Sequence, residues 1–116
     1  MSRSTTERLQ DILEAIRRAR IADDRMLQAE SHQDDDGVHV AFESILHNLF
    51  VIGEAVKGLP TTVLDEASSI PWNEIAALRD VIGHHYHRIV PAIIHRTVRT
   101  DLDPLEKAVQ QLLDRD

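Results

Sequence analysis

The apolar pattern between residues 38 and 59 constrains the fold more than any other feature of the chain. Its members are spaced alternately by four and by three residues, which places them on one face of an α-helix. They are Val38, Phe42, Ile45, Leu49, Ile52, Val56 and Leu59. Because a face this long must be covered by other helices, we expect this segment at the centre of a bundle. Gly53 lowers its helix propensity, and the close approach of another helix would explain why a glycine is tolerated there.

Helical periodicity continues through the rest of the chain, which contains few residues that favour strands. We expect further helices over about 4–27, from 72 to 85 or 88, and over about 91–113, with a short helical segment at 61–67. A polar break at 32–37 should separate the first two helices. The sequence therefore predicts an all-α fold, an up-and-down bundle of roughly four to five helices.

The ends of these helices carry recognisable signals. Ser4 and Glu7 have the spacing of a capping box at the start of the first helix. Pro71 fits the first position of the helix that follows it. Asp103 and Pro104 allow two interpretations of the last helical region: a restart with Asp103 as the cap, or a kink within one continuous helix.

Length and composition limit the class of protein. A chain of 116 residues has room for a single domain, covering 1–116. It contains no cysteine, so it can form neither a disulfide nor a thiol nucleophile. The N-terminus lacks the apolar stretch of a signal peptide, and no apolar run approaches the roughly 20 residues that span a bilayer. We expect a soluble, cytoplasmic protein that makes no membrane contact.

The charge is unevenly distributed along the chain. The formal net charge of −7 argues against a protein that holds nucleic acid by a global positive field. The segment 79–99, however, contains four arginines against the single acid Asp80, together with four of the seven histidines. A polyanion could bind there and be repelled elsewhere, which suits transient cleavage. The alternative interpretation is that these arginines are ordinary solvated side chains.

Arg79 occupies an unusual position on the helix expected after Pro71. The residues on its stripe are Trp72, Ile75, Arg79, Ile82 and Tyr86. Because burying an unpaired charge is costly, Arg79 needs a partner, a solvated groove or an anionic substrate. Asp80 is adjacent in sequence, so it should point elsewhere and be a poor direct partner. A structural alternative is an ion pair with Glu54, which would join the second and third long helices.

His84 follows Arg79 by five residues, an offset of about 140° around a straight helix. Arg79 and His84 would then face different directions. Two solutions remain open: the helix loosens or ends near Gly83, or the site is shared between two subunits across a two-fold axis.

An imidazole, a guanidinium and a phenol together suit metal-independent RNA cleavage. The 2′-OH of RNA is an internal nucleophile, so no water needs to be activated. A histidine can take its proton or protonate the departing oxygen. A guanidinium can bind the phosphate while negative charge builds in the transition state. We expect no cofactor and no metal ion, because adjacent histidines on a helix, such as His84 and His85, cannot both face one zinc ion.

The segment Arg79-x4-His84-x-Tyr86 matches the R-x4-H-x-Y motif of HepT proteins, within the broader HEPN motif. Three further sequence segments, in the order expected for this family, also resemble it. They are Ile52-Gly53-Glu54-Ala55, Ile70-Pro71-Trp72 and Asp101-Leu102-x-Pro104-Leu105. The chain therefore resembles the HepT-type HEPN toxin ribonucleases over nearly its whole length.

This resemblance implies a homodimeric bundle with a composite active site in a cleft at the dimer interface. Arg79 and His84 would be catalytic. We expect Asp80 and His85 to support them, because an acid beside the site could orient Arg79 or a histidine. It also implies a type II or type VII toxin–antitoxin pair with an MntA-type nucleotidyltransferase as the antitoxin. That partner would silence the toxin by AMPylation of Tyr86. Asp80 departs from the family, in which Asn is the commonest residue at this position.

Several alternatives remain open at this point. His85 and His87 could act in place of His84, which the motif register favours. The chain could also be a catalytically silent helical adaptor for a nucleotidyltransferase, a hypothesis that Asp80 and the net acidity support. A third possibility is a plain four-helix dimer that makes no contact with nucleic acid.

Overall fold

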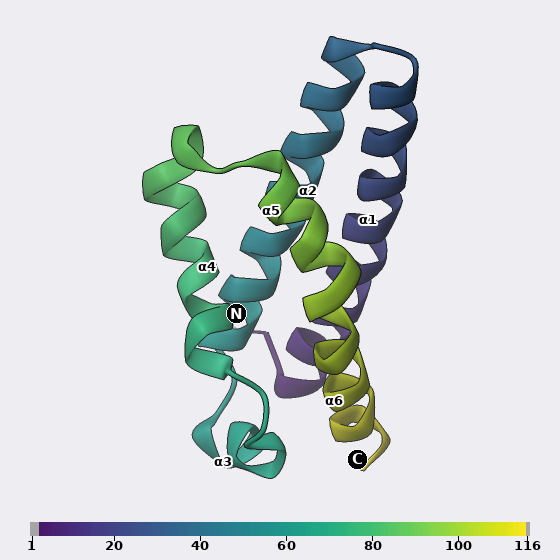
Figure 1. Cartoon of the computed structure of the whole chain (residues 1–116). Coiled ribbons are helices and arrows are strands. Elements are labelled where there is room, and N and C mark those ends of the chain that lie inside the picture. Colours follow the sequence, from purple (N-terminus) through teal and green to yellow (C-terminus); the bar gives the residue numbers. More distant parts are fainter. Residues whose placement is uncertain (1–2, 116) are drawn as a thin grey trace.

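The computed structural model describes residues 3–115, and over this range the chain is all-α without strands, as the sequence predicts (Figure 1). The longer helices are α1 Thr5–Ser31, α2 Asp35–Lys57, α4 Trp72–His85, α5 Pro91–Arg96 and α6 Leu102–Asp114. Shorter elements connect them: α3 Thr61–Leu64, 3₁₀ turns at Asp65–Ala67 and Tyr86–Arg88, and a π-helical turn at Thr97–Asp101. None of the described helices is both long enough and apolar enough to cross a membrane.

Helix α2 lies between α1 and α4, which confirms the central place expected from its apolar stripe. The stripe residues Ile45, Leu49 and Ile52 are completely buried. Helices α1 and α2 form a long antiparallel pair. The end at which α1 connects to α2 extends beyond α4 and α5 (Figure 1). Helix α6 packs on α1, so α4 and the C-terminal helices are attached to different members of this pair.

The first helix begins as predicted and ends later than predicted. The Ser4 side chain accepts a hydrogen bond from the Glu7 backbone N–H at 3.0 Å, and the Ser4 N–H donates to Glu7 Oε1 at 2.9 Å. This confirms the capping box. Helix α1 continues to Ser31, four residues beyond the expected end at Leu27.

The polar break between α1 and α2 is shorter than the expected 32–37. Helix α2 already begins at Asp35, because the Asp34 side chain accepts a hydrogen bond from the Gly37 N–H at 3.0 Å and so caps the helix. Asp35 and Asp36, which the sequence places in the break, therefore lie in the first helical turn, at the positive end of the helix dipole.

The last helical region is continuous from Pro91 to Asp114, which confirms the continuous helix and not the restart. Asp103 is not a cap: it lies inside α6, where its carboxylate pairs with Arg20 of α1 at 2.5 Å. Pro104 has no N–H to donate to the preceding turn, and the π-helical turn immediately before α6 accommodates this loss.

Helices α2 and α4 approach each other closely at Gly53, as the sequence suggests. A Cβ atom at this position would lie 3.0 Å from the backbone N of Arg79 and 3.2 Å from the carbonyl oxygen of Ile75. On its other side, α4 borders a groove of about 450 Å³ that separates it from the π-helical turn and the start of α6. The contact at Gly53 therefore sets the position of α4.

We predict that Gly53→Ala lowers the free energy of unfolding by about 1–3 kcal/mol, because the added methyl group forces two packed backbones apart. Gly83→Ala is the matched control. Gly83 lies in α4, and a methyl group added there would have no neighbouring atom within 4 Å, so this change should raise stability by up to about 1 kcal/mol. Urea unfolding followed by the fluorescence of Trp72 measures both values. Shifts of the same sign would contradict the packing constraint.

Candidate active site

Arg79 lies on the side of α4 that faces α2, and its charged group is held by that helix. The Glu54 carboxylate forms an ion pair with Nε of Arg79. The guanidinium carbon lies 5.5 Å from the centroid of the Phe50 ring, within the range of a cation–π contact. The side chain is 38% exposed, so part of it remains open to solvent. The ion pair between Arg79 and Glu54, which the sequence offers as a structural alternative, is therefore present.

Asp80 also contacts Arg79, and the expectation that it would point elsewhere is wrong. Its Oδ1 atom lies 3.3 Å from Nη1 of Arg79 and 3.8 Å from Nζ of Lys57 on α2. Adjacent Cβ atoms on a helix do diverge, but the long arginine side chain bends back and brings its charged end to the neighbouring carboxylate. The charge of Arg79 is therefore shared between Glu54 and Asp80.

His84 is exposed near the end of α4. Its Nδ1 lies 2.9 Å from the backbone oxygen of Asp80, one turn earlier. One way to bring His84 towards Arg79 is for the helix to end near Gly83. Helix α4 does end close to Gly83, but His84 still lies within its last turn. Across residues 3–115 of one chain, no hydrogen bond or ion pair joins Arg79 to His84.

Tyr86 begins the 3₁₀ turn that follows α4 and is half-buried against the apolar core. Its ring stands edge-to-face with that of His87, with 5.5 Å between the ring centroids. His85 and His87 are both exposed. The last turn of α4 and the turn after it thus present three neighbouring imidazoles and one phenol at one end of the helix.

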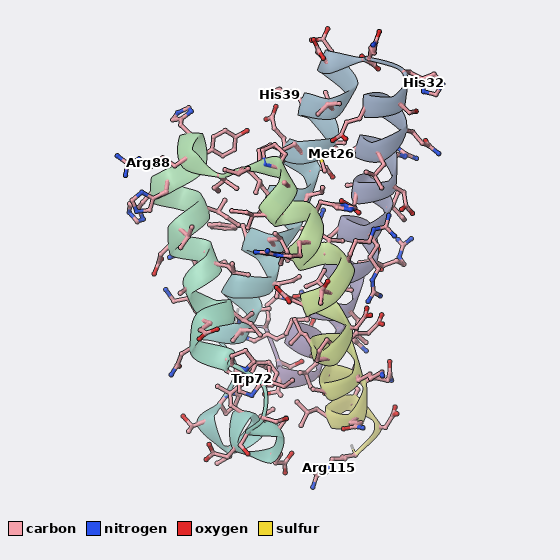
Figure 2. All side chains as sticks on the ribbon, viewed as in Figure 1. Met26, His32, His39, Trp72, Arg88 and Arg115 are labelled. Carbon is pink, nitrogen blue, oxygen red and sulfur yellow. The ribbon has the colours of Figure 1, made fainter. Side chains whose placement is uncertain are left out.

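Two arginines of the segment 79–99 form no ion pair among the described residues. They are Arg88, in the turn after α4, and Arg96, at the end of α5. Figure 2 shows Arg88 at the opposite end of α4 from Trp72, with its side chain directed away from the bundle. These two cations are therefore available to an anionic ligand, whereas Arg79 and Arg99 are paired with acids.

His95, which the sequence groups with the other histidines of this segment, has a different role. Its Nδ1 lies 2.8 Å from Oδ1 of Asp23, a completely buried carboxylate on α1 that also accepts a hydrogen bond from Nε of Arg99 at 2.8 Å. Hydrogen bonds from Arg99 to Asp23 and Asp24 raise the pKa of this arginine above its ordinary value, so it stays charged. The described residues include no group of three or more potential ligands that could hold a metal ion.

Sequence reasoning missed Asp23, although a signal was present. Asp23 stands on the apolar stripe of α1 between Ala19 and Met26, just as Arg79 stands on the stripe of α4. A charged residue on a buried stripe needs a partner, and applying that rule to α1 would have predicted a buried network. The network joins α1 to the region of α5 and the π-helical turn.

In one chain, these groups form two separate parts of a possible site. One part is a guanidinium held beside α2, with some of its donors open to solvent. The other is an exposed imidazole beside a phenol at the end of α4. A guanidinium can bind a phosphate, and an imidazole can move a proton, so the two parts together carry the groups needed for phosphodiester chemistry.

Comparison with known proteins assigns the family. Residues 4–112 match the family described as HepT-like, ribonuclease HepT-like. The chain belongs to this family. The match covers α1 through most of α6 and includes every residue of the R-x4-H-x-Y motif. The resemblance seen in the sequence is thereby confirmed.

Individual relatives of the chain carry ribonuclease names. The chain is 36% identical over 77 residues to a candidate RNase of Caldanaerobacter subterraneus subsp. tengcongensis, covering 66% of this chain and 69% of that protein. It is 30% identical over 112 residues to a candidate ribonuclease HepT of Thermococcus cleftensis, covering 97% and 98%. A candidate RNase of Methanocaldococcus jannaschii is 32% identical over 78 residues, or 64% of each chain. No solved structure matches the chain.

Proposed function

We propose that this chain is a metal-independent endoribonuclease and the toxin of a type II or type VII toxin–antitoxin pair. The observation that carries the proposal is the family match over residues 4–112, which includes Arg79, His84 and Tyr86 in their motif register. The exposure of His84 and the partial exposure of Arg79 support it, because both groups can reach a bound strand.

In this proposal His84 and Arg79 divide the chemistry. The imidazole of His84 takes the proton of a ribose 2′-OH, and the 2′-oxygen attacks the adjacent phosphorus. The bond from phosphorus to the 5′-oxygen breaks, the departing oxygen takes up a proton, and a 2′,3′-cyclic phosphate remains. Arg79 stabilises the negative charge on the phosphoryl oxygens as the new bond forms. The unpaired cations Arg88 and Arg96 bind neighbouring phosphates of the strand.

A second copy of the chain completes the site in this proposal. Within one chain Arg79 and His84 point to different sides of α4, and a two-fold partner would supply the missing member of each pair. Exposed apolar side chains on the same segment support a dimer. Val81, Val90 and Ile93 are 44%, 49% and 51% exposed, and a second chain could cover them.

The same proposal assigns Tyr86 as the point of control. An MntA-type nucleotidyltransferase would transfer the adenylyl group of ATP to its hydroxyl, with release of pyrophosphate and the phenol proton, and so silence the toxin. The bulk and negative charge of AMP next to His84 would exclude a phosphate from the site.

A second candidate function is a catalytically silent adaptor for a nucleotidyltransferase. The pairing of Arg79 with both Glu54 and Asp80 favours it, because two carboxylates oppose the approach of a phosphate. Expression of this chain alone discriminates between the two functions: a toxin arrests growth, whereas an adaptor leaves growth unchanged.

Arg79→Ala and His84→Ala should each lower the rate of RNA cleavage by about 10²–10⁴-fold, while circular dichroism stays unchanged. The assay uses purified chain and RNA in the presence of EDTA. His87→Ala is the matched control, because its imidazole is exposed beside the motif, and this variant should retain most of the activity. Full activity in the Arg79 and His84 variants would refute the assigned roles.

Co-expression with a nucleotidyltransferase encoded next to this chain should add the mass of an adenylyl group, which is AMP less one water, to the intact protein. The same experiment with Tyr86→Phe should give the unmodified mass, because the acceptor hydroxyl is missing. Intact mass spectrometry reads both results directly. An equal mass increase in Tyr86→Phe would show that another residue is modified.

A further inference from the structure

Glu54 is an acid on α2, one residue after the glycine that brings α2 and α4 together. Its side chain, 48% exposed, forms an ion pair at Nε of Arg79, a buried nitrogen that has no hydrogen-bond partner among the described residues. We propose that Glu54 is a positioning residue for RNA cleavage, and that it holds Arg79 so that the terminal nitrogens of the guanidinium face the scissile phosphate. This inference rests on the proposed ribonuclease function.

The donor geometry of the guanidinium supports this role. Arginine presents five N–H donors in a rigid planar fork and binds a phosphate best through two parallel hydrogen bonds. When a carboxylate occupies Nε, the edge formed by Nη1 and Nη2 remains for the phosphate. The Phe50 ring, 5.5 Å from the guanidinium carbon, restricts the group further. The contacts of Glu54 and Phe50, from one turn of α2, therefore fix which edge of the Arg79 guanidinium faces the phosphate.

The close packing at Gly53 holds Glu54 at a fixed position relative to Arg79. The backbone N of Arg79 is packed against Gly53, so the backbone positions of residues 54 and 79 are fixed relative to each other. An ion pair between two half-exposed side chains contributes little to stability, because water screens it. Orientation of the guanidinium is therefore the larger consequence of this contact.

Asp80 is bound differently and can yield its place to the substrate. It contacts Nη1, on the edge that a phosphate would use, at the long distance of 3.3 Å. Lys57 lies 3.8 Å from the same carboxylate oxygen and offers Asp80 another partner. In this arrangement Glu54 stays on Arg79 throughout the reaction, whereas the phosphate displaces Asp80.

The test compares Glu54→Gln with the unaltered full-length chain in steady-state cleavage of RNA. We expect kcat to fall roughly 10- to 100-fold, because the phosphate-binding edge is no longer held in register. KM should not rise, because removing a negative charge beside the site does not weaken the binding of a polyanion. Glu43→Gln is the matched control. Glu43 is on the same helix, is similarly exposed, and among residues 3–115 pairs only with His39, so its loss should leave both constants unchanged.

The Nε–H resonance of Arg79 gives a second readout that does not depend on activity. In the unaltered chain this proton should exchange slowly with water, and in Glu54→Gln it should exchange faster. An unchanged kcat, a rise in KM alone, or an unchanged exchange rate would each overturn the positioning role while the unaltered chain still cleaves RNA. If the unaltered chain does not cleave RNA, the proposed function fails and the positioning role falls with it.

Discussion

The close approach of α2 and α4 at Gly53 is the constraint on which the rest of the site depends. Helix α4 carries Arg79 and His84, is followed directly by Tyr86, and is attached to the bundle mainly through α2. Without a side chain at residue 53, the backbone of Arg79 can pack directly on α2. The same turn of α2 then supplies Phe50 and Glu54 to its guanidinium. One glycine therefore fixes both where the motif helix lies and what surrounds its charged residue.

Much of the fold could be predicted because local signals and the apolar pattern agree. The stripe between residues 38 and 59 predicts the central helix, and Ser4 with Glu7 predicts the start of α1. Where the sequence leaves two alternatives open, a tertiary contact decides between them. Asp103 has the sequence position of a cap, but a longer-range pairing with Arg20 determines its place. Such a choice depends on tertiary contacts, which periodicity does not describe.

The candidate site could be predicted only in part. The motif identifies its residues, but the partners of those residues depend on side-chain length and helix packing. The stripe position of Arg79 correctly indicates a need for partners, and Glu54 is one of the alternatives that the sequence suggests. The contact with Asp80 was missed, because neighbouring positions on a helix were treated as too divergent to meet. The buried Asp23 was missed because the rule that drew attention to Arg79 was not applied to α1.

A site shared between two chains explains how Arg79 and His84 could act together although they do not meet within one chain. The most direct test is to unfold Arg79→Ala and His84→Ala chains together and refold them as a mixture. A mixed dimer then holds one intact Arg79 and one intact His84 on different chains. If the site is shared, the mixture should regain RNA cleavage that neither variant has alone. If native mass spectrometry detects mixed dimers and cleavage is still absent, the two residues do not form a site across the interface.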